Sequence, residues 1–113
     1  MFKEHDDYGF KDVLDGITMQ LMCHGEHTLL ARFKLMGGSE LPIHKHPYEQ
    51  TGFMLSGHMK LTIGDEIFDV KAGDSWCIPL DVVHGAHVLA DSMVVEVFSP
   101  PREDYLKLSR SDK

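Results

Sequence analysis

Apolar and polar side chains alternate along most of this chain, in short runs separated by stretches that contain glycine or proline. Residues 17–24, ITMQLMCH, and 28–36, TLLARFKLM, follow this pattern on either side of a glycine turn, which predicts a β-hairpin. Residues 59–63 and 67–70 predict a second hairpin. About ten such runs, closely spaced, predict an all-β barrel or sandwich.

The last predicted strand is apolar on both faces. Its residues alternate between Met93, Val95 and Val97 on one side and Val94, Glu96 and Phe98 on the other. One face can fill the barrel, and the other then needs a cover, most simply a second subunit or the polar lead-in at residues 1–11. We therefore expect a homodimer. In the C-terminal tail, residues 100–113, prolines before acidic residues predict one short helix.

Length and charge limit the function classes. The 113 residues are enough for one domain, spanning residues 1–113. The formal net charge of −7, without a block of basic residues, argues against nucleic acid as a partner. No apolar run resembles a signal peptide or a membrane span, so we expect a soluble, cytoplasmic protein without a membrane partner. Cys23 and Cys77 fit reduced thiols, and Cys77 is expected in the core or the pocket wall.

Three histidines carry the candidate chemistry. His44 and His46 are two residues apart, a spacing that puts both imidazoles on one face of a strand, and Gln50 continues the same parity. With His84 they make a nitrogen-rich site that suits one divalent transition metal: Zn, Ni, Fe, Mn or Cu. Glu49 would replace Gln50 as the oxygen ligand if a bulge intervened. The alternative is a polar interior without metal, which would require partners for several buried imidazoles.

These residues resemble the two motifs of the cupin family. Gly38, His44, His46, Gln50 and Gly57 follow the order of the first motif, with glutamine where glutamate is usual. Gly73, Pro79 and His84 follow the second, with Asp81 at its glycine and Val88 at its asparagine. The resemblance implies a cupin double-stranded β-helix, a jelly-roll barrel, with a short C-terminal helical segment.

A narrower resemblance covers roughly residues 42–106. HPYEQ at residues 46–50, IPLDVVHGA at 78–86 and the ending EVFSPPREDY at 96–105 look like the small cupins known as pectin-degradation proteins. Members of that group bind a metal through three His and a Gln, and they convert 4,5-unsaturated uronate monosaccharides from pectin or alginate to linear keto acids. The resemblance implies catalytic roles for Glu96, in place of the usual aspartate, and Arg102.

The chemistry of these side chains agrees with those roles. A glutamate on an apolar face inside a barrel is costly unless it is paired, protonated or functional. Glu96 would move the proton, Arg102 would clamp the uronate carboxylate as a fork, and Phe98 would pack on the sugar. Tyr48 shares the parity of Gln50 and would also line the substrate cavity. Alternatively, Glu96 and Arg102 form a structural ion pair.

Two other functions remain open from the sequence. A metal with three His ligands and free positions can bind O2, which would suit a dioxygenase of a small molecule. A cupin barrel can also be a non-enzymatic sugar-binding or ligand-binding module, and fold analogy does not choose among these functions.

Overall fold

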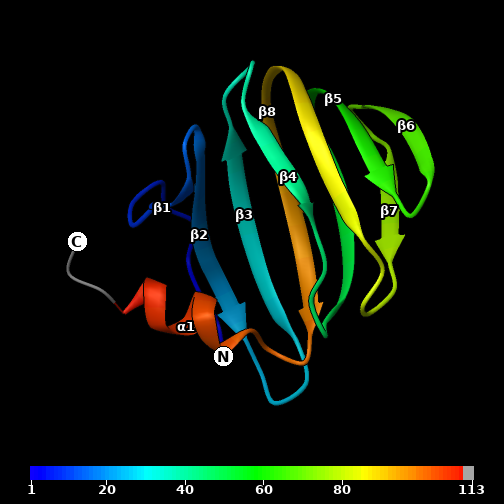
Figure 1. The fold of residues 1–113 in the computed structure, drawn as a ribbon. Helices are drawn as coiled ribbons and strands as arrows, with labels where there is room; N and C mark the ends of the chain where they lie inside the picture. Colours follow the sequence, from blue (N-terminus) through cyan, green and yellow to red (C-terminus); the bar gives the residue numbers. More distant parts are fainter. Residues whose placement is uncertain (111–113) are drawn as a thin grey trace.

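A computed structural model describes residues 1–110 of the chain. Within these residues the chain forms, in order, β1 (Lys11–Leu14), β2 (Ile17–His24), β3 (Leu29–Leu35), β4 (Glu40–His44), β5 (Glu49–Ile63), β6 (Glu66–Lys71), β7 (Ser75–Ile78), β8 (His84–Ser99) and α1 (Glu103–Ser109) (Figure 1). The prediction of an all-β fold with one short C-terminal helix is confirmed.

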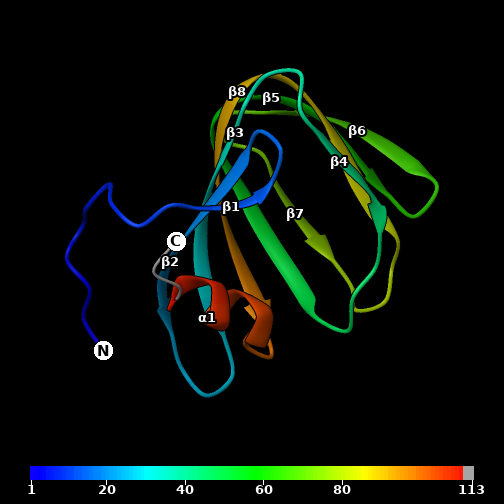
Figure 2. The ribbon, with the colours of Figure 1, turned by 60° about the vertical axis from the view of Figure 1, so that its left-hand side comes forward.

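Two long antiparallel strands organise the barrel. β5 has 15 residues and β8 has 16, and the two strands pair along almost their whole length. The first half of β8 also pairs with β4, and its second half pairs with β3. The two halves therefore belong to two facing layers (Figures 1 and 2). The prediction of about ten short strands was wrong, because irregular pairing interrupts the alternation inside these strands without ending them.

The bend in β5 depends on Gly57. The register of β5 against β8 shifts between Met54 and Met59, and Gly57 has a φ of +111°. A Cβ on Gly57 would lie 2.1 Å from the Oγ of Ser92 and 2.5 Å from its Cα. Ser92 Oγ accepts a hydrogen bond from the His58 N–H at 3.1 Å. The strands approach closely here, which only glycine permits.

The hydrophobic core fills the space between the layers, and α1 packs against it at one end of the barrel. Phe33, Phe98 and Tyr105 pack edge to face, with ring centroids 5.4 to 6.4 Å apart. Tyr105 is the buried residue of α1, so this aromatic group attaches the helix to the barrel. The other buried core residues are Ile17, Met19, Leu29, Ala31, Met54, Met59, Leu61, Val70 and Val94.

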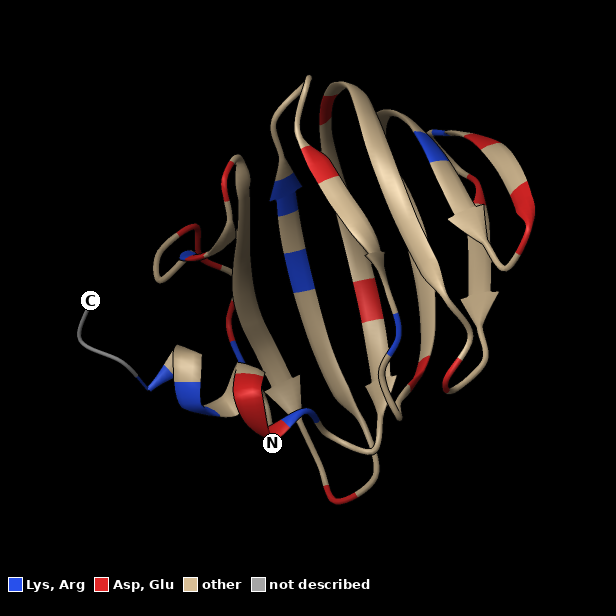
Figure 3. Cartoon of the chain, viewed as in Figure 1, with Lys and Arg blue, Asp and Glu red and all other residues tan. Residues whose placement is uncertain are grey.

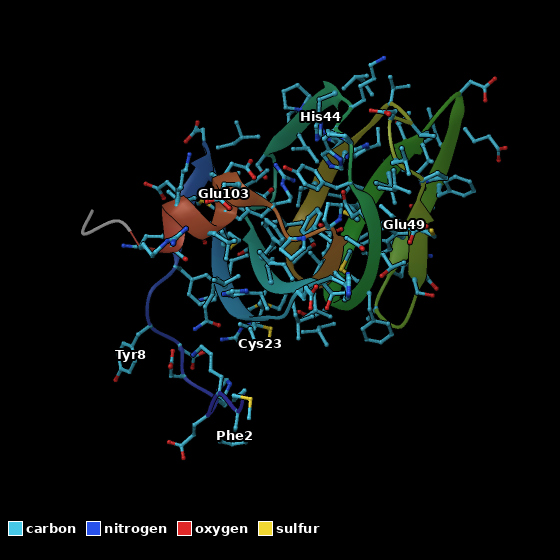
Figure 4. All side chains as sticks on the ribbon, turned by 90° about the horizontal axis from the view of Figure 1, so that it is seen from below. Phe2, Tyr8, Cys23, His44, Glu49 and Glu103 are labelled. Carbon is cyan, nitrogen blue, oxygen red and sulfur yellow. The ribbon has the colours of Figure 1, made fainter. Side chains whose placement is uncertain are left out.

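The N-terminal lead-in extends away from the barrel (Figure 2). Phe2 and Tyr8 lie on this extension and are exposed (Figure 4). The main-chain carbonyl of Asp6 accepts hydrogen bonds from Gln20 at 3.1 Å and from Arg32 at 2.7 Å. The lead-in thus contacts a polar pair on β2 and β3. Phe53, on the outer face of β5, is 40% exposed, and the homodimer stays a prediction.

The surface carries charges of both signs, and the basic residues are scattered over several elements (Figure 3). Cys23 and Cys77 are free, as predicted. Cys77 was expected in the core or the pocket wall; it is exposed, so it is not in the core, and it does not line the cavity that contains the histidines. Cys77 pairs across from Thr51, which also points outward. No helix among residues 1–110 is both long enough and apolar enough to span a membrane.

We expect Gly57→Ala to destabilise the fold far more than Gly64→Ala. Both glycines have a positive φ, but nothing lies within 4 Å of a Cβ on Gly64. Gly64→Ala should cost about 1 kcal/mol of unfolding free energy for the backbone conformation alone. Gly57→Ala adds a collision with Ser92 and should cost more than about 3 kcal/mol in all. Urea unfolding of both variants measures the difference, and equal losses would contradict the role of the close approach.

Candidate functional site

Three histidine side chains meet inside the barrel. His44 ends β4, His46 lies in the loop after it, and His84 begins β8, where it pairs with His44. The ring centroid of His84 lies 4.2 Å from that of His44 and 4.8 Å from that of His46. One ring nitrogen of each histidine lies within 4.8 Å of the other two. The structure therefore brings together the three histidines that the sequence singled out; His44 is labelled in Figure 4.

Backbone carbonyls orient two of the rings. The Nδ1 atoms of His44 and His84 donate hydrogen bonds to the carbonyls of Pro42 at 2.9 Å and Val82 at 3.0 Å. Since a carbonyl only accepts, Nδ1 carries the proton, which leaves Nε2 with a free lone pair. Burial lowers the pKa of His84 to about 4. Burial, and then the charge of Arg102, lower the pKa of His46. Metal binding requires such neutral imidazoles.

The turn before His84 also holds the His46 loop. Asp81 has a φ of +61°, in the left-handed region, at the position where the second cupin motif has glycine. Aspartate tolerates this conformation better than most residues. The Asp81 N–H donates a hydrogen bond to the carbonyl of His46 at 2.9 Å. The substitution therefore keeps the turn of the motif and joins two histidine-bearing segments.

Gln50 turns its carboxamide oxygen toward the histidines. Its side chain is buried, and its Oε1 lies 3.1 Å from His46 Nε2. The Gln50 oxygen and the His46 ring therefore face the same part of the cavity. Glu49, the alternative oxygen ligand, is exposed. The donor set that fits a cation is therefore His44, His46, Gln50 and His84.

Glu96 lies behind Gln50 and lines the same cavity. Its Oε2 accepts a hydrogen bond from Gln50 Nε2 at 2.7 Å, and its Oε1 accepts one from Trp76 Nε1 at 3.0 Å. Burial raises the pKa of Glu96 to about 7, although these hydrogen bonds and the charge of Arg102 oppose the shift. The hydrogen-bond partners of Glu96 are uncharged, and the alternative of a structural ion pair between Glu96 and Arg102 is not found among the described residues.

Arg102 instead pairs with Asp104, at the start of α1. Its Nε and one Nη donate to the two carboxylate oxygens of Asp104 at 3.1 and 2.7 Å. The guanidinium carbon lies 3.7 Å from the ring centre of Tyr105, 5.0 Å from Phe98 and 5.2 Å from Tyr48. The Arg102 side chain is only 12% exposed. Asp104 and three aromatic rings thus hold the guanidinium in place. Asp104 occupies the N–H groups of one edge, and those of the other edge are left for a ligand.

The candidate residues line one cavity of about 70 Å³. Its polar wall consists of His44, His46, Gln50, His84, Glu96 and Arg102, and Phe98 and Tyr105 are among its apolar residues. Tyr48, which was expected to line the cavity, is not part of its wall; it contacts the His46 ring at 5.5 Å between centroids.

Sequence reasoning missed the contributions of Trp76, Asp104 and Tyr105. One signal for Trp76 was Gly52, a strand glycine at an inward position, which often marks the close approach of another group. Asp104 and Tyr105 carried no signal, because their contacts depend on where α1 packs.

Comparison with known proteins supports this description of the fold. Residues 31–99 match a family model described as a cupin domain. A comparison with curated protein sequences finds no match. The solved structure of KdgF from Halomonas sp. is similar, with 29% identity, a TM-score of 0.82, and coverage of 89% of this chain and 91% of that chain.

Two further structures have the same fold. An RmlC-like cupin from Shewanella frigidimarina has 26% identity, a TM-score of 0.82, and coverage of 91% of this chain and 96% of that one. The polyketide cyclase RemF from Streptomyces resistomycificus has 21% identity, a TM-score of 0.77, and coverage of 88% and 80%. The matching family model covers more than half of the residues of this chain, so the chain belongs to the cupin family.

Proposed function

We propose that this cupin binds one divalent transition metal ion and opens the ring of 4,5-unsaturated uronate monosaccharides to give linear keto acids. The observation that carries the proposal is the convergence of a four-ligand donor set, Glu96 and Arg102 on one small cavity. The cavity suits a single small molecule, which would occupy the cavity and its mouth.

The ligand set consists of neutral groups. Three imidazoles and one amide oxygen leave the charge of a divalent ion largely uncancelled, so an ion among Zn, Ni, Fe, Mn or Cu would attract an anionic ligand. When bound, such an ion supplies Lewis acidity toward an oxygen of the ligand.

Arg102 is the group that would bind the uronate carboxylate. Its Asp104-facing edge is occupied, and the remaining N–H groups can bind a planar carboxylate in bidentate fashion. The stacked ring of Tyr105 limits the rotation of the guanidinium, which reduces the entropy lost on binding. Phe98, also on the cavity wall, would pack on the sugar, and Tyr48 would support Arg102 and His46 from behind.

Glu96 is the group that would move the proton. Ring opening of the hemiacetal removes a proton from the anomeric hydroxyl, and ketonisation of the released enol adds one to carbon, so the reaction is an isomerisation without a net redox change. A carboxyl with a pKa of about 7 can accept and return a proton near neutral pH. The similarity to KdgF over about nine-tenths of both chains supports the resemblance of this chain to the pectin-degradation cupins.

We expect the metal-free protein to bind one equivalent of Zn²⁺ or Ni²⁺, and His84→Ala to lower the affinity by more than about 100-fold, because one of few ligands is lost. His87→Ala is the matched control. His87 lies on the same strand, is exposed and bonds to Glu40, so its loss should leave the affinity unchanged. Isothermal titration of the dialysed proteins gives both values, and equal affinity of His84→Ala and wild type would rule out His84 as a ligand.

We expect the metal-loaded protein to remove the conjugated double bond of an unsaturated uronate monosaccharide, seen as a loss of absorbance at about 230–235 nm. Chelation should stop the reaction, and an oxygen electrode should record no uptake of O2. Uptake of O2 with a different substrate would favour a dioxygenase. Absence of turnover with metal bound would favour a ligand-binding cupin.

We expect Arg102→Lys to reduce kcat/KM for the uronate by about 100-fold, mainly through KM, because lysine keeps the charge but loses the bidentate fork and the stacking on Tyr105. Arg110→Lys is the control, since Arg110 is exposed at the end of α1. Steady-state kinetics of both variants test the clamp. A kcat/KM of Arg102→Lys close to the wild-type value would assign the carboxylate to another group.

A further inference from the structure

The orientation of the Gln50 carboxamide decides whether this side chain can bind a cation. Its oxygen and nitrogen ends have nearly the same shape, but only the oxygen can be a metal ligand. Gln50 Nε2 lies 2.7 Å from Glu96 Oε2, and Gln50 Oε1 lies on the side of His46. A carboxylate accepts hydrogen bonds, so it selects the NH2 end and leaves the oxygen facing the histidines.

Trp76 fixes Glu96 in turn. The indole Nε1 donates to Glu96 Oε1 at 3.0 Å, so each carboxylate oxygen has its own donor. Trp76 and Glu96 are on different strands, β7 and β8, with β5 between them. An indole must cross β5 to reach this carboxylate.

Gly52 makes the crossing possible. It is the β5 partner of both Trp76 and Glu96, so the three residues form one row across three strands. A Cβ on Gly52 would lie 2.3 Å from the indole Nε1 and would therefore collide with the Trp76 ring. The absence of a side chain at this position therefore lets the indole lie over β5 and donate to Glu96.

We propose that Trp76 and Glu96 are positioning residues that hold the Gln50 oxygen toward the metal site, and that Glu96 is the reason position 50 is glutamine. The usual cupin glutamate at this position would place a second carboxyl group at hydrogen-bond distance from Glu96, and two carboxyl groups so close cannot both be ionised. Gln50 and Glu96 thus form a donor–acceptor pair: the amide of Gln50 faces the metal site, and the carboxylate lies next to it, on the side away from the histidines. The inference rests on the metal site of the proposed function, and it adds to the proton-transfer role of Glu96.

Exchange of the two side chains tests the pair. The double variant Gln50→Glu/Glu96→Gln keeps the net charge and every hydrogen bond: the new amide donates to the new carboxylate, and its oxygen accepts from Trp76. In each single variant, two acceptors or two donors face each other. At about pH 8.5, where carboxylates are ionised, we expect each metal-free single variant to melt about 5 °C below wild type and the double variant within about 2 °C of it.

Zn²⁺ affinity tests the orientation, by competition with a chromophoric chelator. Glu96→Gln should bind Zn²⁺ about 10-fold to 100-fold more weakly, and Trp76→Phe, which keeps a ring but loses the N–H, should weaken binding several-fold. Glu49→Gln makes the same charge change on the neighbouring exposed residue labelled in Figure 4, and it should bind Zn²⁺ as wild type does. The proposal would be overturned if the melting shift of the double variant were the sum of the two single shifts, or if Glu96→Gln bound Zn²⁺ as tightly as wild type.

These readouts separate the inference from the proposed activity. Neither measurement contains a uronate, so a protein inactive on uronates would still show the exchange effect if the pair positions the ligand. If the protein acts on uronates but the melting shift of the double variant equals the sum of the two single shifts, the proposed function stands and this inference fails.

Discussion

The close approach of β5 and β8 at Gly57 is the constraint on which the site depends. A straight strand of the length of β8 would span about 50 Å, whereas the longest extent of the molecule is 35 Å. Because the paired strands bend, the two ends of β8 come to the same place: the His46 ring lies 4.8 Å from that of His84 and 6.1 Å from that of Phe98. The glycine that ends the first cupin motif thus has a structural role, which is to bring the three histidines and Phe98 together.

A polar centre in such a small barrel is stable only if its groups satisfy one another. The chain meets this requirement for most of these groups in two ways, although the Nδ1 of His46 is buried without a hydrogen-bond partner among the described residues. Backbone carbonyls accept from His44 and His84, while Gln50 and Trp76 donate to Glu96. Each buried polar group so paired avoids an uncompensated desolvation cost of about 1–3 kcal/mol. The same bonds set which atoms face the cavity, so the requirements of folding and of ligand orientation are met by the same contacts.

Much of this arrangement could be predicted from the sequence because it follows from spacing. The alternation of apolar residues predicted the sheet faces, and the histidine motifs predicted which side chains share a cavity. The sequence could not predict contacts that depend on the packing of distant segments. Cys77 was expected in the core or the pocket wall, although β7 turns it outward. The sequence also left open whether Glu96 pairs with Arg102; in the structure Asp104, on α1, binds Arg102, and Glu96 accepts from two neutral donors. In both cases local parity does not show which third element contacts a side chain.

Charge at two length scales explains how an acidic protein can favour an anionic ligand. The net charge of −7 repels a uronate at a distance, but at physiological ionic strength such fields decay within about 8 Å. Inside the cavity the balance is local. Burial raises the pKa of Glu96 to about 7, which reduces its negative charge near neutral pH, and the Arg102 guanidinium lies against three aromatic rings. A carboxylate that enters therefore meets Arg102, and any cation that His44, His46, Gln50 and His84 hold, with little opposing charge. If the ligand is an acid, as proposed, selectivity for it would therefore depend on the cavity wall and not on the net charge of the surface.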